Sequence, residues 1–268
     1  MTLLPKVRYS WLLLLLAAAY GCKGGSSREA ATVGTTGGEA VDGEGVTGTT
    51  GAADTPSPWG ATRAEQCKRP ARPAIDSKAQ RAIDQGVQAA ANGDTATAEK
   101  QFQDAVKRDG GAYVAHYNLG VLADRRGDEK SALSSYRRSL EALPDYAPAA
   151  RGIATISLRR DRAQDALDVV EPIADAYRTN LDIQALYAEL LVQVQRYDEA
   201  WMAARRALKC DERFVPALIA LIKASRAQGR DELADSILDQ ALEVDPNEAE
   251  LHYLDGERLK AEPGRLRE

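Results

Sequence analysis

Small side chains return every 34 residues through most of this 268-residue chain. One series is Ala98, Ala132, Ala166, Ala200 and Ala234, and a second series of small or apolar residues with the same interval is Gly86, Gly120, Ala154, Ala188 and Ile222. Each position lies in a stretch whose apolar residues recur at helical spacing. Self-similarity at a period of roughly 20 to 50 residues marks an array of repeated units. The sequence therefore predicts five units, at residues 79–112, 113–146, 147–180, 181–214 and 215–248.

Each unit is expected to contain two helices joined by a tight turn. In three units the turn carries a glycine, at Gly93, Gly127 and Gly229, and glycine commonly ends a helix. Ser77 and Gln80 have the spacing of a capping box, so the first helix is predicted to begin beside them. After the fifth unit, residues 249–262 predict one more helix, whose charged outer side would cap the array.

Close crossing of two helices explains the small residues. In the second unit, Gly120 would let the first helix approach the second, and Tyr136, four residues after Ala132, would fill the remaining space. A single helix pair leaves one apolar face uncovered, and only a neighbouring pair can cover it. The repeats therefore predict a stacked array of helices without strands.

The second unit resembles the tetratricopeptide repeat, a 34-residue unit of two antiparallel helices. The residues that carry the resemblance are Leu119, Gly120, Ala132, Tyr136 and Pro144. The resemblance implies an all-α fold, a right-handed superhelix of about five helix pairs with a C-terminal capping helix. It also implies that the first helices of the units line a concave groove and that other proteins bind in this groove.

By this resemblance, the groove would be lined by exposed positions of the first helices. They include Ile83, Val87, Tyr117, Asn118, Val121, Arg125, Arg151, Thr155, Arg159, Glu189, Lys223 and Arg226. Apolar residues come first, and three arginines then form a basic stretch, which would suit a peptide with an apolar segment beside an acidic one. The alternative is that these arginines are simply solvated on helix surfaces. Asn118 alone matches the carboxylate clamp of some family members, so no clamp is expected.

The third unit departs most from the pattern. Ala154 and Asp161 stand where other units have glycine, and Pro172 falls inside the predicted second helix. A proline inside a helix removes one backbone hydrogen bond and crowds the carbonyl four residues earlier. We therefore expect a kink between Asp168 and Pro172 and a local change in the pitch of the superhelix.

The N-terminus has the order of a targeting segment. Lys6 and Arg8 precede the apolar run Trp11–Ala19, which ends shortly before Cys22. This order resembles a bacterial lipoprotein leader, so residues 1–21 would be a signal peptide and Cys22 would become the lipidated first residue. An ordinary cleaved leader and an uncleaved anchor are the alternatives.

Residues 22–76 would form a tether between the lipid and the helical domain, residues 77–262, because most of them are small or polar and few can be buried. Cys67 near the end of the tether and Cys210 at the close of the fourth unit remain after lipidation. A pair of cysteines outside the cytoplasm favours a disulfide, and two free thiols are the alternative. A disulfide would draw the end of the tether across the array, along its groove.

No catalytic pattern is present in the sequence. His116 and His252 fall where the family usually has a packing Trp, so both are expected to be structural. Two His and three Cys are too few for a metal cluster, and neither a nucleophile elbow nor a phosphate-binding loop is found. The net charge of -5 supplies no attraction to nucleic acid. We therefore expect no enzymatic activity, no cofactor and no bound metal.

The expected protein is a lipid-anchored scaffold that faces the periplasm and holds another envelope protein. By architectural resemblance, it would serve the assembly of a type IV pilus secretin, a gliding-motility complex or an outer-membrane protein complex. Lys23 is not the Asp that often retains such lipoproteins at the inner membrane, so the outer membrane is preferred. One alternative is a peptidoglycan- or carbohydrate-binding module, which would need exposed aromatics such as Tyr117 and Tyr253. Another is an accessory subunit of an enzyme complex.

Overall fold

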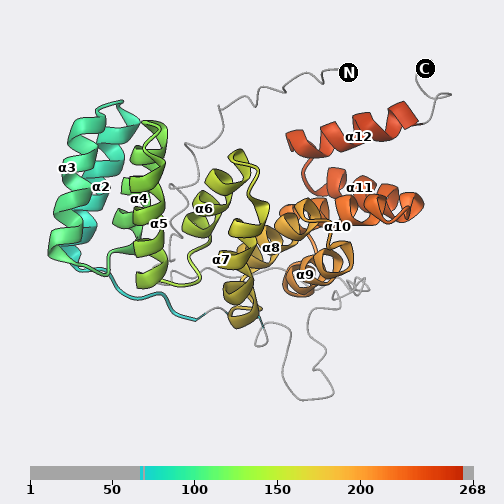
Figure 1. Ribbon diagram of the computed structural model, residues 1–268, viewed down its shortest axis with the longest axis horizontal. Coiled ribbons are helices and arrows are strands. Elements are labelled where there is room, and N and C mark those ends of the chain that lie inside the picture. The colour runs from blue at the N-terminus through green and yellow to red at the C-terminus, as the bar shows by residue number, and fades with distance from the viewer. Residues whose placement is uncertain (1–66, 69, 262–268) are drawn as a thin grey trace, which may run out of the picture. The chain divides into compact units, whose positions relative to one another are not determined.

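The computed structural model describes residues 67–68 and 70–261, all within one compact unit, Ala52–Glu268 (Figure 1). Every regular element of these residues is an α-helix, which confirms the predicted all-α array. The helices are α2 (Ser77–Ala91), α3 (Thr95–Arg108), α4 (Tyr113–Arg125), α5 (Glu129–Ala142), α6 (Ala147–Arg159), α7 (Ala163–Ala176), α8 (Leu181–Gln193), α9 (Tyr197–Cys210), α10 (Val215–Ala227), α11 (Asp231–Val244) and α12 (Ala249–Ala261). The predicted signal peptide, Cys22 and the tether up to residue 66 lie outside the described residues, as does residue 262.

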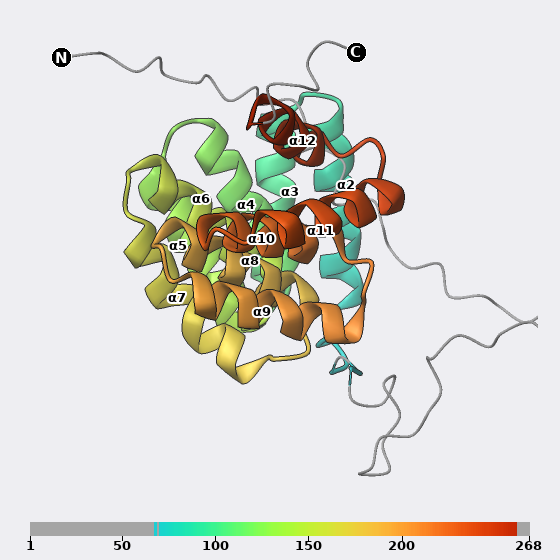
Figure 2. The ribbon, with the colours of Figure 1, turned by 90° about the vertical axis from the view of Figure 1, so that its right-hand side faces the viewer.

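The helix boundaries repeat the interval of the sequence. The first helices of units two to five and then the cap helix begin at Tyr113, Ala147, Leu181, Val215 and Ala249. The second helices of all five units begin at Thr95, Glu129, Ala163, Tyr197 and Asp231. Within each series, consecutive starts are 34 residues apart. Consecutive helices contact each other along the array, and their axes turn progressively from α2 to α12 (Figures 1 and 2). The arrangement is an all-α superhelix.

The first helix begins with a cap that differs from the predicted one. Asp76 is the cap of α2, and its carboxylate accepts hydrogen bonds from the backbone N–H groups of Lys78 at 2.8 Å and Ala79 at 3.1 Å. Ser77 is the first helical residue, so the predicted capping box at Ser77 is wrong. An Asp and a Ser cap a helix equally well, and the sequence offers both at this position.

The turn inside each unit uses a left-handed residue at the same repeat position. The φ angles are 81° at Gly93, 77° at Gly127, 57° at Asp161, 62° at Gln195 and 71° at Gly229. In the fourth unit, the N–H of Gln195 donates to the carbonyl of Val192 at 3.1 Å and the N–H of Arg196 donates to that of Leu191 at 2.9 Å. This pair of bonds is the Schellman motif. Asp161 and Gln195 therefore adopt the turn that glycine makes in the other units.

The repeated small residues form the core between helices. Ala98, Ala132, Ala166, Ala200 and Ala234 are all 0% exposed. Tyr136 of α5 lies between two glycines, because a Cβ atom added at either Gly120 or Gly152 would lie 2.6 Å from its ring. One aromatic side chain thus packs against the first helix of its own unit and against that of the next unit. This confirms the close crossing predicted from Gly120 and Tyr136.

The third unit keeps its helices but packs them less closely. α7 runs continuously from Ala163 to Ala176 through Pro172. Pro172 and Asp168 are both exposed, so water can bond the carbonyl that the proline leaves without a donor. α6 and α7 contact each other less extensively than the helix pairs of the first, second and fourth units do.

Candidate binding surface on the first helices

The first helices of neighbouring units lie against one another. α4 contacts α6, α6 contacts α8 and α8 contacts α10. We call the exposed side of α4, α6, α8 and α10 the A-helix face. Most of the predicted groove residues belong to these four helices, so they share one continuous surface.

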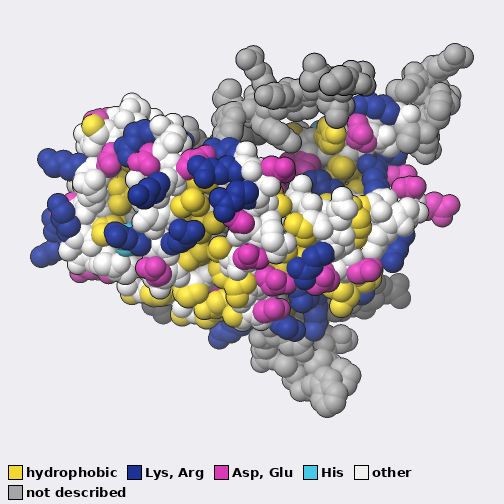
Figure 3. All heavy atoms as spheres, in the orientation of Figure 1, with side chains coloured by type: hydrophobic (Ala, Val, Ile, Leu, Met, Phe, Trp, Pro, Cys, Tyr) yellow, Lys and Arg dark blue, Asp and Glu magenta, His cyan; other side chains and the backbone are white. Residues whose placement is uncertain are grey.

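Ion pairs join α6 to the first helices on either side of it, α4 and α8. Arg159 of α6 pairs with Asp124 of α4, and Arg151 of α6 pairs with Glu189 of α8 at 3.0 Å. The residues in each pair are about one repeat apart in sequence, so the stacking of units brings them together. Arg151 and Arg159, two members of the predicted basic stretch, are therefore neutralised within the array. On the face that Figure 3 shows, basic and acidic side chains are likewise interspersed.

Two further predicted groove residues hold the cap helix. Lys223 of α10 pairs with Glu250 of α12. Arg226 donates to the backbone carbonyl of Leu254 at 2.9 Å and to Asp235 of α11 at 3.0 Å. These contacts fasten α12 to the fifth unit, so Lys223 and Arg226 serve the capping of the array.

The predicted apolar end of the groove lies partly in the core. Ile83 is 2% exposed and packs with Phe102 of α3 and with Ala115 and Leu122 of α4. The second unit therefore covers Ile83, and its assignment to the groove is wrong. Val87, one turn further along α2, is only half-buried and stays at the surface.

Tyrosines form a packed cluster at the second unit. The ring of Tyr117 lies 5.8 Å from that of Tyr136 and 5.6 Å from that of Tyr146, and the rings of Tyr113 and Tyr146 are 4.9 Å apart. Burial raises the pKa of Tyr117, Tyr136 and Tyr146 above the ordinary value, so their hydroxyls stay neutral at physiological pH. The two pairs that include Tyr146 are edge contacts, which aromatic rings favour.

Two polar residues of the predicted groove bond to their own helices. The amide of Asn118 donates to the carbonyl of Val114 at 2.8 Å, and the hydroxyl of Thr155 donates to the carbonyl of Arg151 at 2.9 Å. Both side chains are half-buried. Part of the hydrogen-bonding capacity of both side chains is therefore already used within their own helices.

One stripe of α4 keeps side chains available for a partner. Tyr117, Val121 and Arg125 follow one another at intervals of four residues, so they lie on one side of the helix. Tyr117 and Val121 are half-buried and Arg125 is exposed. Among the described residues, no carboxylate pairs with Arg125. We call these three residues the α4 stripe.

The two histidines hold loops between helices. A ring nitrogen of His116, Nε2, lies 3.0 Å from the carbonyl oxygen of Gly110, and Nε2 of His252 lies 2.9 Å from that of Pro246. His116 is buried, whereas His252 is exposed. Within the part of the chain that the structure describes, no three His, Cys, Asp or Glu side chains are grouped so that they could hold a metal ion.

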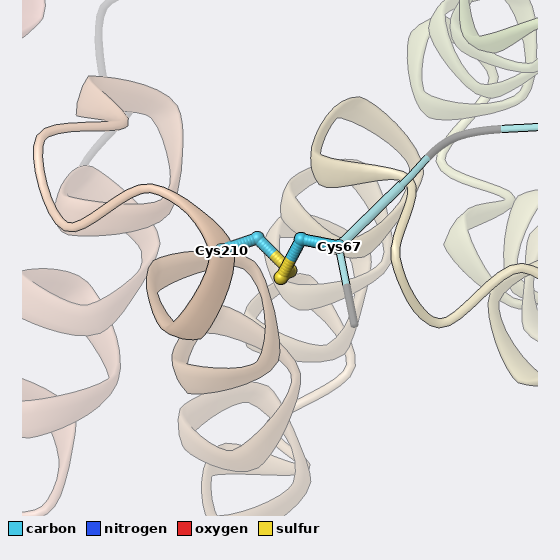
Figure 4. Close-up of a disulfide and its surroundings, with 2 residues drawn as sticks. All are labelled: Cys67 and Cys210. Carbon is cyan, nitrogen blue, oxygen red and sulfur yellow. A yellow bond between two sulfur atoms is a disulfide. The ribbon is translucent and has the colours of Figure 1, made fainter. Parts of the chain in front are cut away.

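A disulfide joins the start of the described chain to the fourth unit. Cys67 is bonded to Cys210, the last residue of α9, with Cα atoms 5.5 Å apart (Figure 4). Residues 67–68 and 70–76, which we call the strap, connect this bond to α2. The backbone N–H of Asp76 donates to Asp109 at 3.0 Å, and Ile75 packs against the core of the first unit.

The strap crosses the array from the first unit to the fourth, as the predicted disulfide requires. Asp109 lies in the loop between the first two units and Cys210 ends α9, directly before the loop that leads to the fifth unit. The strap connects these two places along one side of the array (Figure 1). Arg72 interacts electrostatically with Tyr146, which also lies in such a loop. The described strap residues therefore run beside the loops that join successive units.

None of the helices in the described ranges has both the length and the apolar character needed to cross a membrane.

Comparison of the sequence with protein-family models and with curated proteins finds no match. Solved structures with the same arrangement include a tetratricopeptide repeat protein from Parabacteroides merdae, with a TM-score of 0.52, 18% identity and coverage of 69% of this chain and 77% of that one. They also include TTC0263, a thermophilic TPR protein of Thermus thermophilus, with a TM-score of 0.50, 20% identity and coverage of 68% and 98%. At such identities the likeness concerns the fold alone. The helical array therefore has the fold of these tetratricopeptide-repeat structures.

Proposed function

We propose that the protein is a lipid-anchored scaffold of the cell envelope, which holds a segment of another envelope protein on the A-helix face. The observation that carries the proposal is the α4 stripe. Tyr117 and Val121 leave an apolar surface beside Arg125, which pairs with no carboxylate of residues 67–68 and 70–261, while neighbouring charges are neutralised in pairs. A segment with an apolar residue followed by a carboxylate suits this order.

The rigidity of the surface supports binding at this place. Tyr117 is held between Tyr136 and Tyr146, so little conformational entropy is lost when a partner covers it. A partner carboxylate elsewhere on the face would have to compete with Asp124 for Arg159 or with Glu189 for Arg151. Arg125 is therefore the cation that a partner reaches most easily.

The cellular setting is proposed from the N-terminal sequence. A lipid on Cys22 would attach the chain to the outer membrane, facing the periplasm, and the tether would let the array reach partners at a distance. A flexible chain of about 50 residues has an r.m.s. reach of roughly 40 Å. The scaffold would serve the assembly of a pilus secretin, a gliding-motility complex or an outer-membrane protein complex.

Crosslinking in intact cells tests the scaffold. A photo-crosslinking residue at Val121 should join one envelope protein, whereas the same residue at Gln103, exposed on α3, should not. Arg125→Glu should reduce the crosslink. The proposal fails if Val121 and Gln103 give the same products. Sedimentation with purified cell-wall sacculi that depends on Tyr117 would instead support carbohydrate binding.

Fractionation of cells tests the anchor separately. Cys22→Ala should move the protein from the membrane fraction to the soluble fraction. If the variant stays in the membrane fraction, the lipid anchor is refuted, whatever the outcome at Val121.

A further inference from the structure

A second surface lies on the second helices, away from the A-helix face. Between α9 and α11 there is a hollow of about 520 Å³. Trp201 and Met202 of α9 form one wall, Leu233 and Ile237 of α11 form the other, and Leu221 of α10 lies at the bottom. The walls are exposed, since Met202 is 56% and Leu233 is 42% exposed, whereas Leu221 is 7% exposed.

The repeats provide an internal comparison for these exposed apolar residues. The positions equivalent to Met202 in the other units hold Lys100, Ser134, Asp168 and Ser236. The positions equivalent to Leu233 hold Thr97, Ser131, Asp165 and Glu199. The fold therefore accepts polar residues at both places, and neither Met202 nor Leu233 is needed to build a unit. Large apolar side chains that are exposed without a packing role point to a binding surface.

The charge around the hollow differs from that of the neighbouring second helices. Arg205, Arg206 and Lys209 of α9 line it, whereas the positions equivalent to Arg205 and Lys209 are acidic in the third unit and again in the fifth. The guanidinium of Arg205 lies over the ring of Trp201, 4.5 Å from its centroid, and no carboxylate pairs with Arg205 in the described part of the chain. Arg206 donates to the amide oxygen of Gln184 at 2.8 Å.

We propose that the hollow between α9 and α11 is a docking site for an amphipathic helix of a partner protein, with acidic residues beside its apolar stripe. Two helices form the walls, and a third helix packs between two others by placing its side chains in their grooves. The acidic flank would face Arg205, where charge complementarity selects the partner and its orientation. This site is independent of the α4 stripe.

Photo-crosslinking at matched repeat positions tests the site in intact cells. A crosslinking residue at Met202 should join a defined segment, which mass spectrometry should identify as an acidic amphipathic helix. The same residue at Ser134, the equivalent position of the second unit, should not join it. The proposal is overturned if both positions give the same products, or if the segment from Met202 is basic, lipid or a second copy of this chain. It is also overturned if Met202 joins nothing.

Affinity for the identified segment, made as a labelled peptide, gives the second measurement. Met202→Ser and Leu233→Thr introduce residues that the chain itself uses at equivalent positions, so the fold should be kept. Each should weaken binding about tenfold or more, the effect of removing a central interface side chain. Arg205→Glu should weaken it similarly, and Arg137→Glu, the equivalent change in the second unit, should have no effect. Equal affinities for all variants would refute the site even if the crosslink forms.

Discussion

Removing the disulfide should destabilise the array by an amount that follows from the sequence separation of its two cysteines. Cys67 and Cys210 are 143 residues apart in sequence. In the chain-entropy treatment, a crosslink that closes so long a loop lowers the free energy of the folded state relative to the unfolded one by about 5 kcal/mol. In the reduced protein part of the strap would gain freedom in the folded state, which offsets some of this loss. We therefore expect the free energy of unfolding to fall by about 2 to 5 kcal/mol in Cys67→Ser/Cys210→Ser.

Urea unfolding followed by far-ultraviolet circular dichroism measures this loss. The double variant should unfold at a lower urea concentration and with a larger m-value, because its unfolded chain exposes more surface. Lys68→Ser changes the strap without touching the bond and should unfold like the wild type. The reasoning is refuted if the double variant and the wild type have the same midpoint, or if both cysteines of the unreduced wild type react with a thiol label.

The loss of stability on reduction of the disulfide should also be uneven along the array. The crosslinked loop contains the first four units, whereas α10 to α12 lie outside it. In a solenoid each unit contacts only its neighbours, so local opening of one unit need not involve distant ones. Reduction should therefore raise amide hydrogen exchange mainly within the first four units. A uniform rise that includes α12 would contradict this account.

Three further predictions concern single positions. Gly120→Ala should lower the free energy of unfolding by about 1 to 3 kcal/mol in chemical denaturation, because its Cβ would lie 2.6 Å from the Tyr136 ring; no loss would contradict the close crossing. Gln195→Gly should raise that free energy by about 0.5 to 1 kcal/mol, because φ is 62° there, whereas Gln193→Gly, at the last residue of α8, should lower it. Burial raises the pKa of Tyr187 from 10.0 to about 12, so the stabilisation from its neutral hydroxyl is full below pH 10 and is lost as the pH rises toward 12. The melting temperature should therefore fall less steeply with pH over that range in Tyr187→Phe than in the wild type, and equal slopes would refute the role of Tyr187.

The fold could be predicted because its decisive contacts recur within the sequence. Ala132 and its equivalents every 34 residues are fully buried, and such a period is visible without any structure. The turns were only partly predictable. Neither Asp161 nor Gln195 is a glycine, so the residue type does not predict a left-handed turn there. Only their positions, 34 and 68 residues after Gly127, predict it.

The surface was harder to predict than the core. Whether Arg159 is solvated or paired depends on Asp124, which lies in another unit and comes near it only when the units stack. Ile83 was assigned to the groove because its repeat position is exposed in the family, yet α4 covers it here. The hollow between α9 and α11 did leave a signal in the sequence, since Met202 and Leu233 break a polar pattern. That signal appears when the units are aligned with one another.

The distribution of charge separates the roles of the two proposed surfaces. On the A-helix face most charges are paired across units, so they attract little from a distance, and binding there would depend on contact with the α4 stripe. Arg205 near the hollow has no carboxylate partner within the described ranges, so its charge can steer an acidic partner before contact. The α4 stripe belongs to the second unit and the hollow to the fourth and fifth, so neither occupant would block the other. A partner that carried both segments would gain avidity from the array that joins the sites.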